Sequence, residues 1–481
     1  MGDNFKQKTI SVVTWTAVDR IGQQIFQFIV GLILARLIAP EAFGLIAMLA
    51  VFNALSYVLV DSGFGQSIIR KKTSNPQELS TIFFLNVGIG VFLYILLYLS
   101  APAIASFFQQ PGLINIARVA FLSIVFNAFY LIPLNVLAIR LDIKSITKGN
   151  IAATLLSGTL GIILAFMNVG VWALVWQQVS YHFFKVIFFH LIVHWQPQFY
   201  FNKNYLSGHI KFSINLLGTG VLNVIFNNIF TLIIGKFFPI KELGFYYQAS
   251  KQSETVNYTF VSILAGSTYN IFSHIQEQTE RLSRILSEFF QKTALVIIPL
   301  QMFLIVCAEN LIVSLIGEKW MPAVPYFQLL SAANIVAPLY ALNINVLNAR
   351  GKSRTTFIIE IIKKSMILLA IVAFFSISSK MIIAGYALAG WIAFLITMLA
   401  VKKELKRYWT VQVREILPAI GFGLVIGAIT WLIGRMENNY YLLTGIQLVS
   451  AVILYVTLIR IFYKDIYFTT WKTVKKLIKK K

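Results

Sequence analysis

The residues best suited to chemistry in this chain are charged side chains that stand inside long apolar segments. Asp19 and Arg20 are adjacent in the first of these segments, and Lys251 and Glu254 stand three residues apart in a later one. A three-residue spacing places two side chains on the same face of a helix. Because an Arg or Lys at the centre of an apolar span costs about 2.5–3.5 kcal/mol to insert, such residues indicate a functional polar cavity.

Cations outnumber acids in these segments, which favours an anionic ligand, because Arg and Lys bind phosphate oxygens through charge-assisted hydrogen bonds. We expect a cationic cavity for a phosphate-like group, built from Arg20, Lys251, Arg118 and Lys363. Three acids are candidates for coupling to a proton or another ion: Asp19, Glu254 and Glu360. The alternative is local salt bridges or snorkelling to the membrane interface, which competes most at Arg118 and Lys185 near their segment ends.

Four amides accompany the charges and are expected to line the same cavity or to form interhelical hydrogen bonds: Gln23, Gln27, Asn223 and Asn227. These amides belong to an internal repeat, because residues 21–44 align without gaps with residues 221–244 at an offset of 200. Gly44 then meets Gly244, whereas Arg20 falls opposite Gly220 and has no cationic counterpart. Such glycines more often indicate close helix packing or a turn than a ligand contact, and the same holds for Gly63.

The elements that must position these residues are membrane-spanning helices. Hydrophobic residues make up 58% of the 481 residues and charged residues only 12%, about half of the charged share of a soluble domain. A span needs about 20 mostly apolar residues. Fourteen segments qualify: 11–36, 41–60, 80–100, 112–137, 148–168, 170–194, 209–236, 241–270, 284–316, 322–348, 354–377, 381–401, 414–434 and 441–463.

The distribution of Lys and Arg predicts the orientation of these spans. With both termini in the cytoplasm, nearly all connecting cations fall on the cytoplasmic side, as the positive-inside rule requires. The opposite loops then hold only Arg36, Lys236, Lys241, Lys319, Lys380 and Arg435. The net charge of +23 is thereby explained without a nucleic-acid partner.

The repeat divides the chain into parts. Its offset equals six spans, and an even number of spans preserves orientation, so the halves are expected to be parallel repeats. We expect an all-α polytopic membrane protein with an N-lobe at 1–200, a C-lobe at 201–402, and two further helices with a basic cytoplasmic tail at 403–481. The tail is amphipathic and basic, which favours attraction to anionic lipid.

Soluble enzyme classes find no support in the sequence. No predicted loop exceeds about twenty residues, too few for a catalytic domain of ordinary size, and no P-loop, Rossmann fingerprint or nucleophile elbow is present. Cys307 is the single cysteine, and His182, His190 and His194 are expected to be interfacial histidines rather than metal ligands. The chain is therefore predicted to be a transporter without a cofactor, not an enzyme.

Four segments carry a resemblance to a known family. Residues 34–72 resemble the second-helix motif of polysaccharide exporters, and residues 141–179 resemble the fifth and sixth spans of its lipopolysaccharide biosynthesis branch. Residues 235–251 and 316–335 are similar to that branch as well. The chain thus resembles the Wzx, WzxC-like flippase family of the MOP (multidrug/oligosaccharidyl-lipid/polysaccharide) exporter superfamily.

The resemblance implies two six-helix bundles in a V around a central basic cavity. It implies flipping of undecaprenyl-pyrophosphate-linked oligosaccharides across the bacterial inner membrane by alternating access, for O-antigen, capsule or exopolysaccharide assembly. By helix placement, Arg20 and Lys251 correspond to cavity cations of related lipid-linked flippases. Membrane lipids, a polysaccharide polymerase and a chain-length regulator are the partners that it suggests.

Other functions stay open at this point. A cation-coupled, MATE-like multidrug exporter would need an excess of buried acids, and a peptidoglycan-precursor flippase is a third relative. A membrane glycosyltransferase, O-antigen polymerase or ligase would need a large periplasmic loop or an acidic catalytic motif, and neither is visible. A purely structural scaffold is disfavoured by the repeat with buried charges.

Overall fold

The computed structural model describes residues 2–71, 75–193, 195–405, 409–436 and 439–464. His194 and the basic tail from residue 465 onward, both considered in the sequence, lie outside these ranges. Within them every regular element is a helix and none is a strand. It separates into two compact units, residues 1–247 and 248–481, and each is described by itself. The three-part division at residues 200 and 402 stays a prediction.

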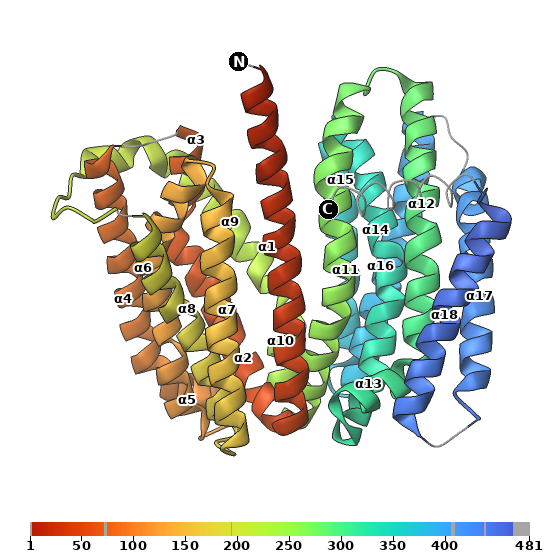
Figure 1. Cartoon of the computed structure of the whole chain (residues 1–481), viewed down its shortest axis with the longest axis horizontal. Helices are drawn as coiled ribbons and strands as arrows, with labels where there is room; N and C mark the ends of the chain where they lie inside the picture. Colours follow the sequence, from red (N-terminus) through yellow and green to blue (C-terminus); the bar gives the residue numbers. More distant parts are fainter. Residues whose placement is uncertain (1, 72–74, 194, 406–408, 437–438, 465–481) are drawn as a thin grey trace. The chain divides into compact units, whose positions relative to one another are not determined.

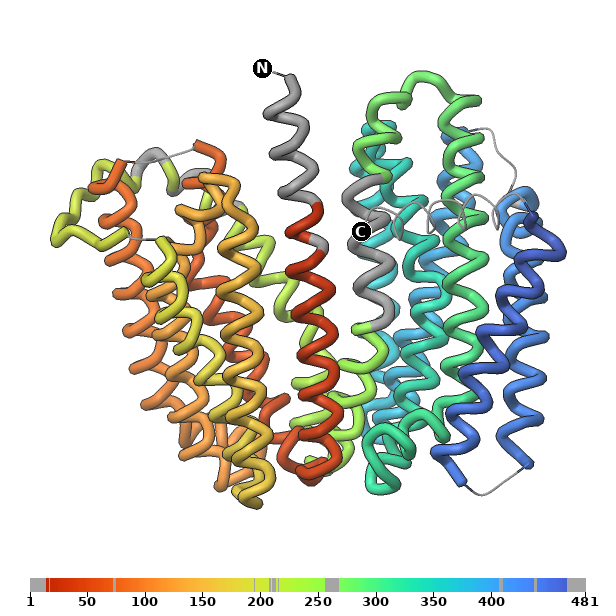
Figure 2. Tube along the Cα trace, viewed as in Figure 1, coloured from red at the N-terminus to blue at the C-terminus, as the bar shows by residue number. Residues whose placement is uncertain are grey.

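The first unit consists of ten helices and the beginning of an eleventh within the described residues (Figure 1): α1 (Gly2–Leu37), α2 (Pro40–Asp61), α3 (Phe64–Lys71), α4 (Pro76–Phe107), α5 (Leu113–Ala120), α6 (Leu122–Ile139), α7 (Ile143–Phe166), α8 (Val171–Val193), α9 (Lys203–Asn227), α10 (Ile229–Phe237) and the start of α11 (Ile240–His274). In Figure 2 the orange to yellow trace of this unit runs up and down along neighbouring helices.

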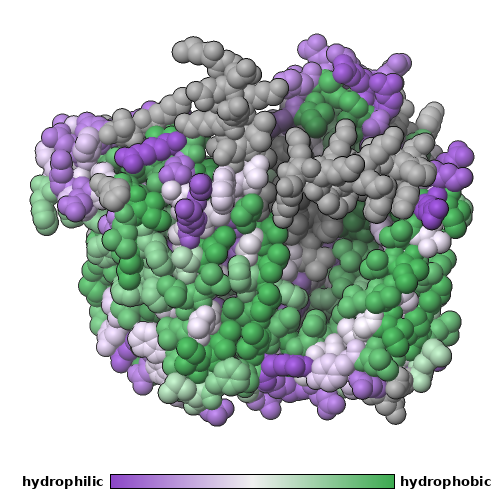
Figure 3. All heavy atoms as spheres, viewed as in Figure 1, coloured by the Kyte–Doolittle hydropathy of each residue, from purple (hydrophilic) through white to green (hydrophobic). Residues whose placement is uncertain are grey.

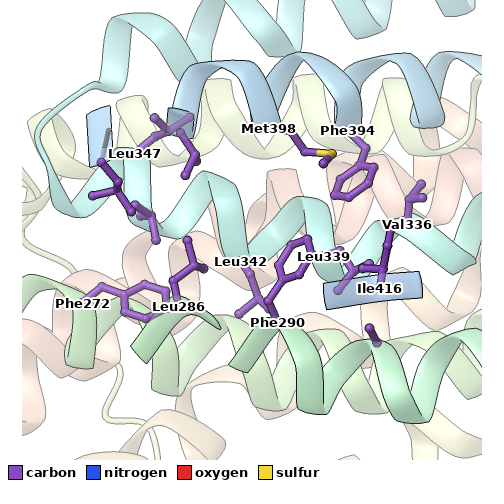
Figure 4. Packing of buried hydrophobic residues seen from close by; sticks show 14 of the residues in the cluster. Phe272, Leu286, Phe290, Val336, Leu339, Leu342, Leu347, Phe394, Met398 and Ile416 are labelled. Atoms are coloured by element: carbon purple, nitrogen blue, oxygen red, sulfur yellow. The ribbon is translucent and has the colours of Figure 1, made fainter. Parts of the chain in front are cut away.

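The second unit contains the rest of α11 and, among its described residues, these elements: α12 (Thr279–Val306), α13 (Ala308–Ile316), the 3₁₀ helix η1 (Glu318–Ala323), α14 (Val324–Ala349), α15 (Ser353–Phe374), α16 (Ser379–Leu405), α17 (Trp409–Ile433) and α18 (Tyr440–Phe462). Its core lies between α12, α14, α16 and α17, where Phe290, Leu342 and Phe394 point toward one another (Figure 4). Inside a membrane, close van der Waals packing of this kind holds helices together.

Local sequence explains where several helices begin and end. α2 and α4 begin at Pro40 and Pro76, because proline fits the first turn, where its missing N–H is not needed. Asn75 caps α4 by accepting from the backbone N–H of Gln77 at 3.0 Å. α2 ends where Ser62 and then Gly63 turn left-handed, with φ of 44° and 70°. The turn expected at Gly63 is thereby confirmed.

The helices have the length and composition of membrane spans. Ten of the described helices are long and apolar enough to cross a membrane, or eleven if the bent pair α9 and α10 forms one span. On the face shown in Figure 3, apolar residues cover the middle of the helices and hydrophilic residues gather at their ends. The expectation of an all-α polytopic membrane protein is confirmed.

Helix covers each of the fourteen predicted segments, but α8, α11 and α15 are not among the ten qualifying helices in the described residues. The count of fourteen spans and the cytoplasmic location of both termini therefore stay predictions.

The internal repeat has a clear structural counterpart in the first unit. α1 ends at Leu37 and α10 ends at Phe237, and the following helices begin at Pro40 and Ile240. Gly44 and Gly244, the paired glycines of the alignment, lie against each other: a Cβ added to either would be 3.4 Å from the backbone nitrogen of the other. Their predicted role in close helix packing is confirmed.

Candidate functional site

Asp19 is held by a network of amides inside the first unit. Asn150 of α7 donates to both carboxylate oxygens of Asp19 at 3.3 Å, and Gln23 donates to one of them at 2.9 Å. The side-chain oxygen of Gln23 in turn accepts from the Tyr181 hydroxyl of α8 at 3.3 Å. A buried carboxylate needs such donors, so the network fixes the direction in which Asp19 points.

The network continues into a cluster of aromatic and cationic groups on α8 and α6. The Lys185 ammonium group lies 4.4 Å from the ring centre of Tyr130 and 5.2 Å from that of Tyr181. His182 contacts the hydroxyls of Tyr130 at 3.1 Å and Tyr57 at 3.0 Å. These contacts are cation–π and hydrogen bonds, the interactions that allow polar groups inside an apolar bundle.

The interfacial or snorkelling interpretation of His182 and Lys185 is wrong. Both side chains are only 8% exposed, because α8 turns this face toward α2, α6 and α7 rather than toward lipid. His190 is half-buried, and its Nδ1 donates to the Val186 carbonyl one turn earlier in α8 at 2.9 Å. Among the described residues, no group of three His, Cys, Asp or Glu side chains is placed to hold a metal ion.

Arg20 follows Asp19 and lies about 100° further round α1, outside this network. Its side chain is exposed, whereas the neighbouring Asp19 turns inward to Asn150. Within the part of the chain that the structure describes, the Arg20 guanidinium has no ion pair with Asp19 and no hydrogen-bond partner. Arg20 is therefore available to a ligand.

Three of the four predicted amides are also exposed. Gln27 lies two turns from Arg20 on the same side of α1, and Asn223 and Asn227 share a face of α9. Gln23 differs from them, because its amide is already engaged with Asp19 and Tyr181. The repeat therefore aligns residues whose surroundings differ.

Arg118 lies in the last turn of the short helix α5 and stacks on a ring of α4. Its guanidinium carbon lies 4.6 Å from the ring centre of Tyr98, and its Nε is buried without a hydrogen-bond partner among the described residues. The side chain is half-buried. The aromatic contact accounts for its position, and a role in ligand binding stays a prediction.

The predicted charges of the second unit lie in two places. Lys251 and Glu254 are both exposed on α11, and Glu254 accepts from Ser250 at 2.9 Å. In the described part of this unit Lys251 and Glu254 form no ion pair, so the alternative of a local salt bridge at this pair finds no support. On α15, Glu360 accepts from the Tyr340 hydroxyl at 2.5 Å, and the Lys363 ammonium group lies 4.7 Å from the same ring centre.

The second unit also has an apolar groove between α12, α17 and α18. Its cavity volume is about 240 Å³, and its walls include Pro299, Phe303, Ile426, Ala451 and Tyr455. The lining is almost wholly hydrocarbon. Such a surface suits an apolar chain rather than a polar solute.

Comparison with known proteins identifies a family for this chain. The family model described as polysaccharide biosynthesis protein matches residues 33–325, more than half of the chain. The chain belongs to the polysaccharide biosynthesis protein family. The resemblance inferred from the sequence motifs is thereby confirmed.

Members of the polysaccharide biosynthesis family are similar to this chain along most of their length. The teichuronic acid biosynthesis protein TuaB of Bacillus subtilis (strain 168) is 26% identical over 359 residues, which cover 73% of each chain. The lipopolysaccharide biosynthesis protein WzxC of Escherichia coli (strain K12) is 24% identical over 382 residues, covering 77% of this chain and 75% of WzxC.

Two solved structures show which fold this family member shares. The lipid II flippase MurJ in an inward closed conformation has a TM-score of 0.74 at 16% identity, covering 95% of this chain and 99% of MurJ. An inward-facing multidrug resistance MATE transporter of the MOP superfamily has a TM-score of 0.61 at 11% identity, covering 82% and 98%. At these identities the likeness concerns the fold alone.

The sequence did not identify most members of the Asp19 network. Asn150, Tyr130 and Tyr57 are single polar groups in apolar helices, and nothing in their spacing relates them to Asp19. One usable signal was the pair Tyr181 and Lys185, whose four-residue spacing puts a ring and a cation on one helix face.

Proposed function

We propose that this chain moves lipid-linked oligosaccharides across the bacterial inner membrane by alternating access. The observation that carries the proposal is membership in the polysaccharide biosynthesis protein family, with relatives named for teichuronic acid and lipopolysaccharide biosynthesis. The fold shared with a lipid II flippase supports it. The substrate class is an undecaprenyl-pyrophosphate-linked glycan.

The exposed cations are the proposed contacts for the pyrophosphate. Arg20 has no described partner, and Lys251 is exposed, so neither must first break an ion pair to bind phosphate oxygens. Lys363 and Arg118 rest on aromatic rings and are proposed as weaker contributors. Gln27, Asn223 and Asn227 are proposed to face the sugars.

The apolar groove of the second unit supports a substrate with a hydrocarbon tail. Its lining offers van der Waals contact and almost no polar group, as Pro299, Phe303 and Tyr455 illustrate. A polyisoprenoid chain has this chemistry, and we propose that part of it lies in the groove. A soluble sugar would gain nothing from these walls.

The three predicted coupling acids differ in their surroundings. Asp19 is fixed by Asn150 and Gln23, Glu360 by Tyr340, and Glu254 is exposed beside Ser250. Because the structure shows Asp19 inside a continuous hydrogen-bonded network, we propose it as the acid whose protonation accompanies transport. Glu254 and Glu360 are the alternatives.

Reconstituted transport tests the proposal directly. Purified protein in vesicles is given a fluorescent undecaprenyl-pyrophosphate oligosaccharide, and flipping is followed by loss of the signal to an external quencher. We expect the wild-type protein to accelerate flipping. The flipping rate of the double variant Arg20→Ala/Lys251→Ala should be lower by a factor of at least about ten, because each lost contact between a cation and phosphate corresponds to roughly such a factor.

The matched control is Lys292→Ala, which removes an exposed cation paired with Glu288 on α12. Its flipping rate should equal that of the wild type. Failure of the wild-type protein to flip the lipid, combined with export of a cationic dye, would replace the proposal with the drug-exporter function. Unchanged flipping by the double variant at normal expression would refute the cavity assignment alone.

A further inference from the structure

Among the described side chains of the first unit, those of α9 contribute little to the apolar core. None of its described apolar side chains is fully buried; Leu206 packs at the edge of a core cluster, and Ile214 and Leu222 are exposed. The short helix α10 that follows buries Phe230 and Ile234. An element with few buried apolar contacts separates from its surroundings at low free-energy cost.

Glycines bring α9 close to α2 and to the turn after α2, with the side chains of Val58 and Leu216 lying against them. A Cβ on Gly220 would lie 2.8 Å from a methyl group of Val58, and a Cβ on Gly63 would lie 3.1 Å from the Cα of Ser213. The two helices are thus close together where each glycine leaves room for a side chain of the other segment. Small residues at a helix contact allow such close approach.

His209 closes the far end of this contact with a set of polar bonds. Its side chain is fully buried, with Nδ1 2.7 Å from the Ser67 hydroxyl of α3 and Nε2 2.6 Å from the Glu78 carboxylate of α4. The Lys71 ammonium group lies 3.4 Å from Nε2 and 4.0 Å from the Glu78 carboxylate. One side chain of α9 therefore binds two helices of the bundle.

The position of one proton on His209 follows from its hydrogen-bond partner Glu78. An ionised Glu78 can only accept, so Nε2 of His209 carries the proton that joins them. The Lys71 charge offsets that of Glu78 across the cluster. Because His209 has no solvent contact, separating it from Glu78 requires that water enter, which gives the closed state a defined barrier.

The segment before α9 is held on the same helix end. The backbone N–H of Gln198 donates to the Ser80 hydroxyl at 3.0 Å, and that of Asn202 donates to the Thr81 hydroxyl at 3.3 Å. Both acceptors lie within one turn of Glu78 on α4. The connection that leads into α9 is therefore held on the same end of α4 as His209.

At its other end, α9 is followed by a bend, and beyond the bend the chain is packed tightly against α2. α9 and α10 meet at Asn228 with an angle of 44° between them. Beyond α10, Gly244 lies so close to α2 that an added Cβ would be 2.0 Å from the Pro40 carbonyl oxygen, and Lys241 forms an ion pair with Glu41 at 3.0 Å. The chain is thus anchored after the bend. Before the bend, its described polar contacts with α3, α4 and the cap of α4 are those of His209, the bonds of the Tyr205 hydroxyl with Asn75 and Gln77, and the two backbone bonds to Ser80 and Thr81.

We propose that α9 is a gate that swings about the bend at Asn228, and that the contacts of His209 with Ser67 and Glu78 are the latch that holds it closed. The inference rests on the proposed transport function, because alternating access requires an element that moves. It assigns His209 and Glu78 as positioning residues of the transport cycle, a role distinct from ligand contact.

A reversible disulfide tests whether the gate opens. A Cβ on Gly220 would lie 3.9 Å from the Cβ of Val58, within the range of disulfides. The variant Val58→Cys/Gly220→Cys, made with Cys307→Ala, should lose flipping of the fluorescent lipid on oxidation and regain it on reduction. The replaced valine leaves room for the new side chain.

The matched control joins α1 to α7. A Cβ on Gly158 would lie 3.6 Å from the Cβ of Val30, so Val30→Cys/Gly158→Cys should form its disulfide and keep flipping. Undiminished flipping by the fully oxidised Val58→Cys/Gly220→Cys protein would show that α9 is not a gate. A wild-type protein that flips no lipid would instead refute the proposed function, and the labelling below would still test the gate.

Thiol labelling tests the latch without any transported substrate. In the Val58/Gly220→Cys background kept reduced, His209→Ala and Glu78→Ala should each raise the labelling rate by about tenfold, the factor expected for loss of a hydrogen bond to a charged group. Glu78→Gln retains an acceptor and should largely restore slow labelling. His274→Ala, which removes an exposed histidine of α11, is the control and should leave the rate unchanged.

The double variant His209→Ala/Glu78→Ala should label no faster than His209→Ala alone, because His209→Ala already removes the bond to Glu78 as well as the bond to Ser67. Unchanged labelling in both single variants with normal melting temperatures would show that His209 is not the latch.

Discussion

The ammonium group of Lys185 is enclosed by aromatic rings. Its place near the end of an apolar segment had instead suggested contact with the membrane surface. Near the end of an apolar helix a lysine ordinarily extends to the membrane surface. Here its stem and head stay among Tyr130, Tyr181 and Phe189, with 8% of the residue exposed. The cation is stabilised by ring faces, and the aliphatic stem fills volume between α6 and α8.

Substitution of Lys185 tests whether this lysine is buried among rings or extends to the membrane surface. Lys185→Met keeps the volume and removes a buried charge, so the melting temperature in detergent should stay equal or rise. Lys185→Ala should lower stability by about 2 kcal/mol or more, because it leaves a cavity. The control Lys292→Ala, at an exposed position, should have little effect. Equal melting temperatures for all three variants would indicate that Lys185 is exposed after all.

The exposure of the candidate cations and amides could be predicted from the sequence only in part. Hydropathy identified Arg20 and Lys251 as costly charges, and both are exposed in the structure. The sequence could not tell that Asp19 is bonded to its neighbours while the adjacent Arg20 is exposed, because that depends on which neighbour each side of α1 meets. It also could not distinguish Gln23, which is bonded, from Gln27, which is exposed.

Among the elements, α2 and the start of α11 form the closest helix contact of the repeat. Gly44 and Gly244 allow two backbones to touch, and the alignment had already paired them. The sequence predicted close packing for Gly44 but not its partner. That the two halves of the repeat touch at equivalent positions is decided by their arrangement in the first unit.

Adding one methyl group to this contact should disrupt it. In Gly244→Ala the new Cβ would lie 2.0 Å from the Pro40 carbonyl oxygen and 2.8 Å from its carbon, both backbone atoms that cannot rotate away. We expect a loss of at least about 1–3 kcal/mol and a lower yield of folded protein. Gly218→Ala on α9, where nothing lies within 4 Å, is the control and should be neutral or slightly stabilising. The measurement is fluorescence-detected melting, and equal values for the two variants would contradict the contact.

For the molecule as a whole, the number of membrane crossings is the main quantity that the sequence predicted and the structure supports only in part. Helix covers every one of the fourteen segments, yet α15 falls outside the ten qualifying helices of the described chain. α15 carries Glu360, Lys363 and Lys364 near its middle, which lowers its apolar character. Its neighbours α14 and α16 both qualify.

Cysteine labelling on either side of α15 tests the predicted topology. In a Cys307→Ala background, Arg354→Cys should react with a membrane-impermeant maleimide only after the cells are opened. Ile377→Cys, which replaces a side chain 63% exposed, should react in intact cells. Labelling of both positions from the same side would show that α15 does not cross, and the count of fourteen would fall.

The sequence by itself determined the helical membrane class, the positions of the helices, the 200-residue repeat and the family. These follow from local properties, because hydropathy and turn residues act over the few residues of one helix. Only the tertiary structure decided that Asn150 bonds Asp19 across 131 residues, that Lys185 is buried, and that His209 meets Glu78. Those pairings depend on how each helix is rotated about its axis and which neighbour it packs against, and an apolar helix in a membrane carries little periodic signal to fix that rotation.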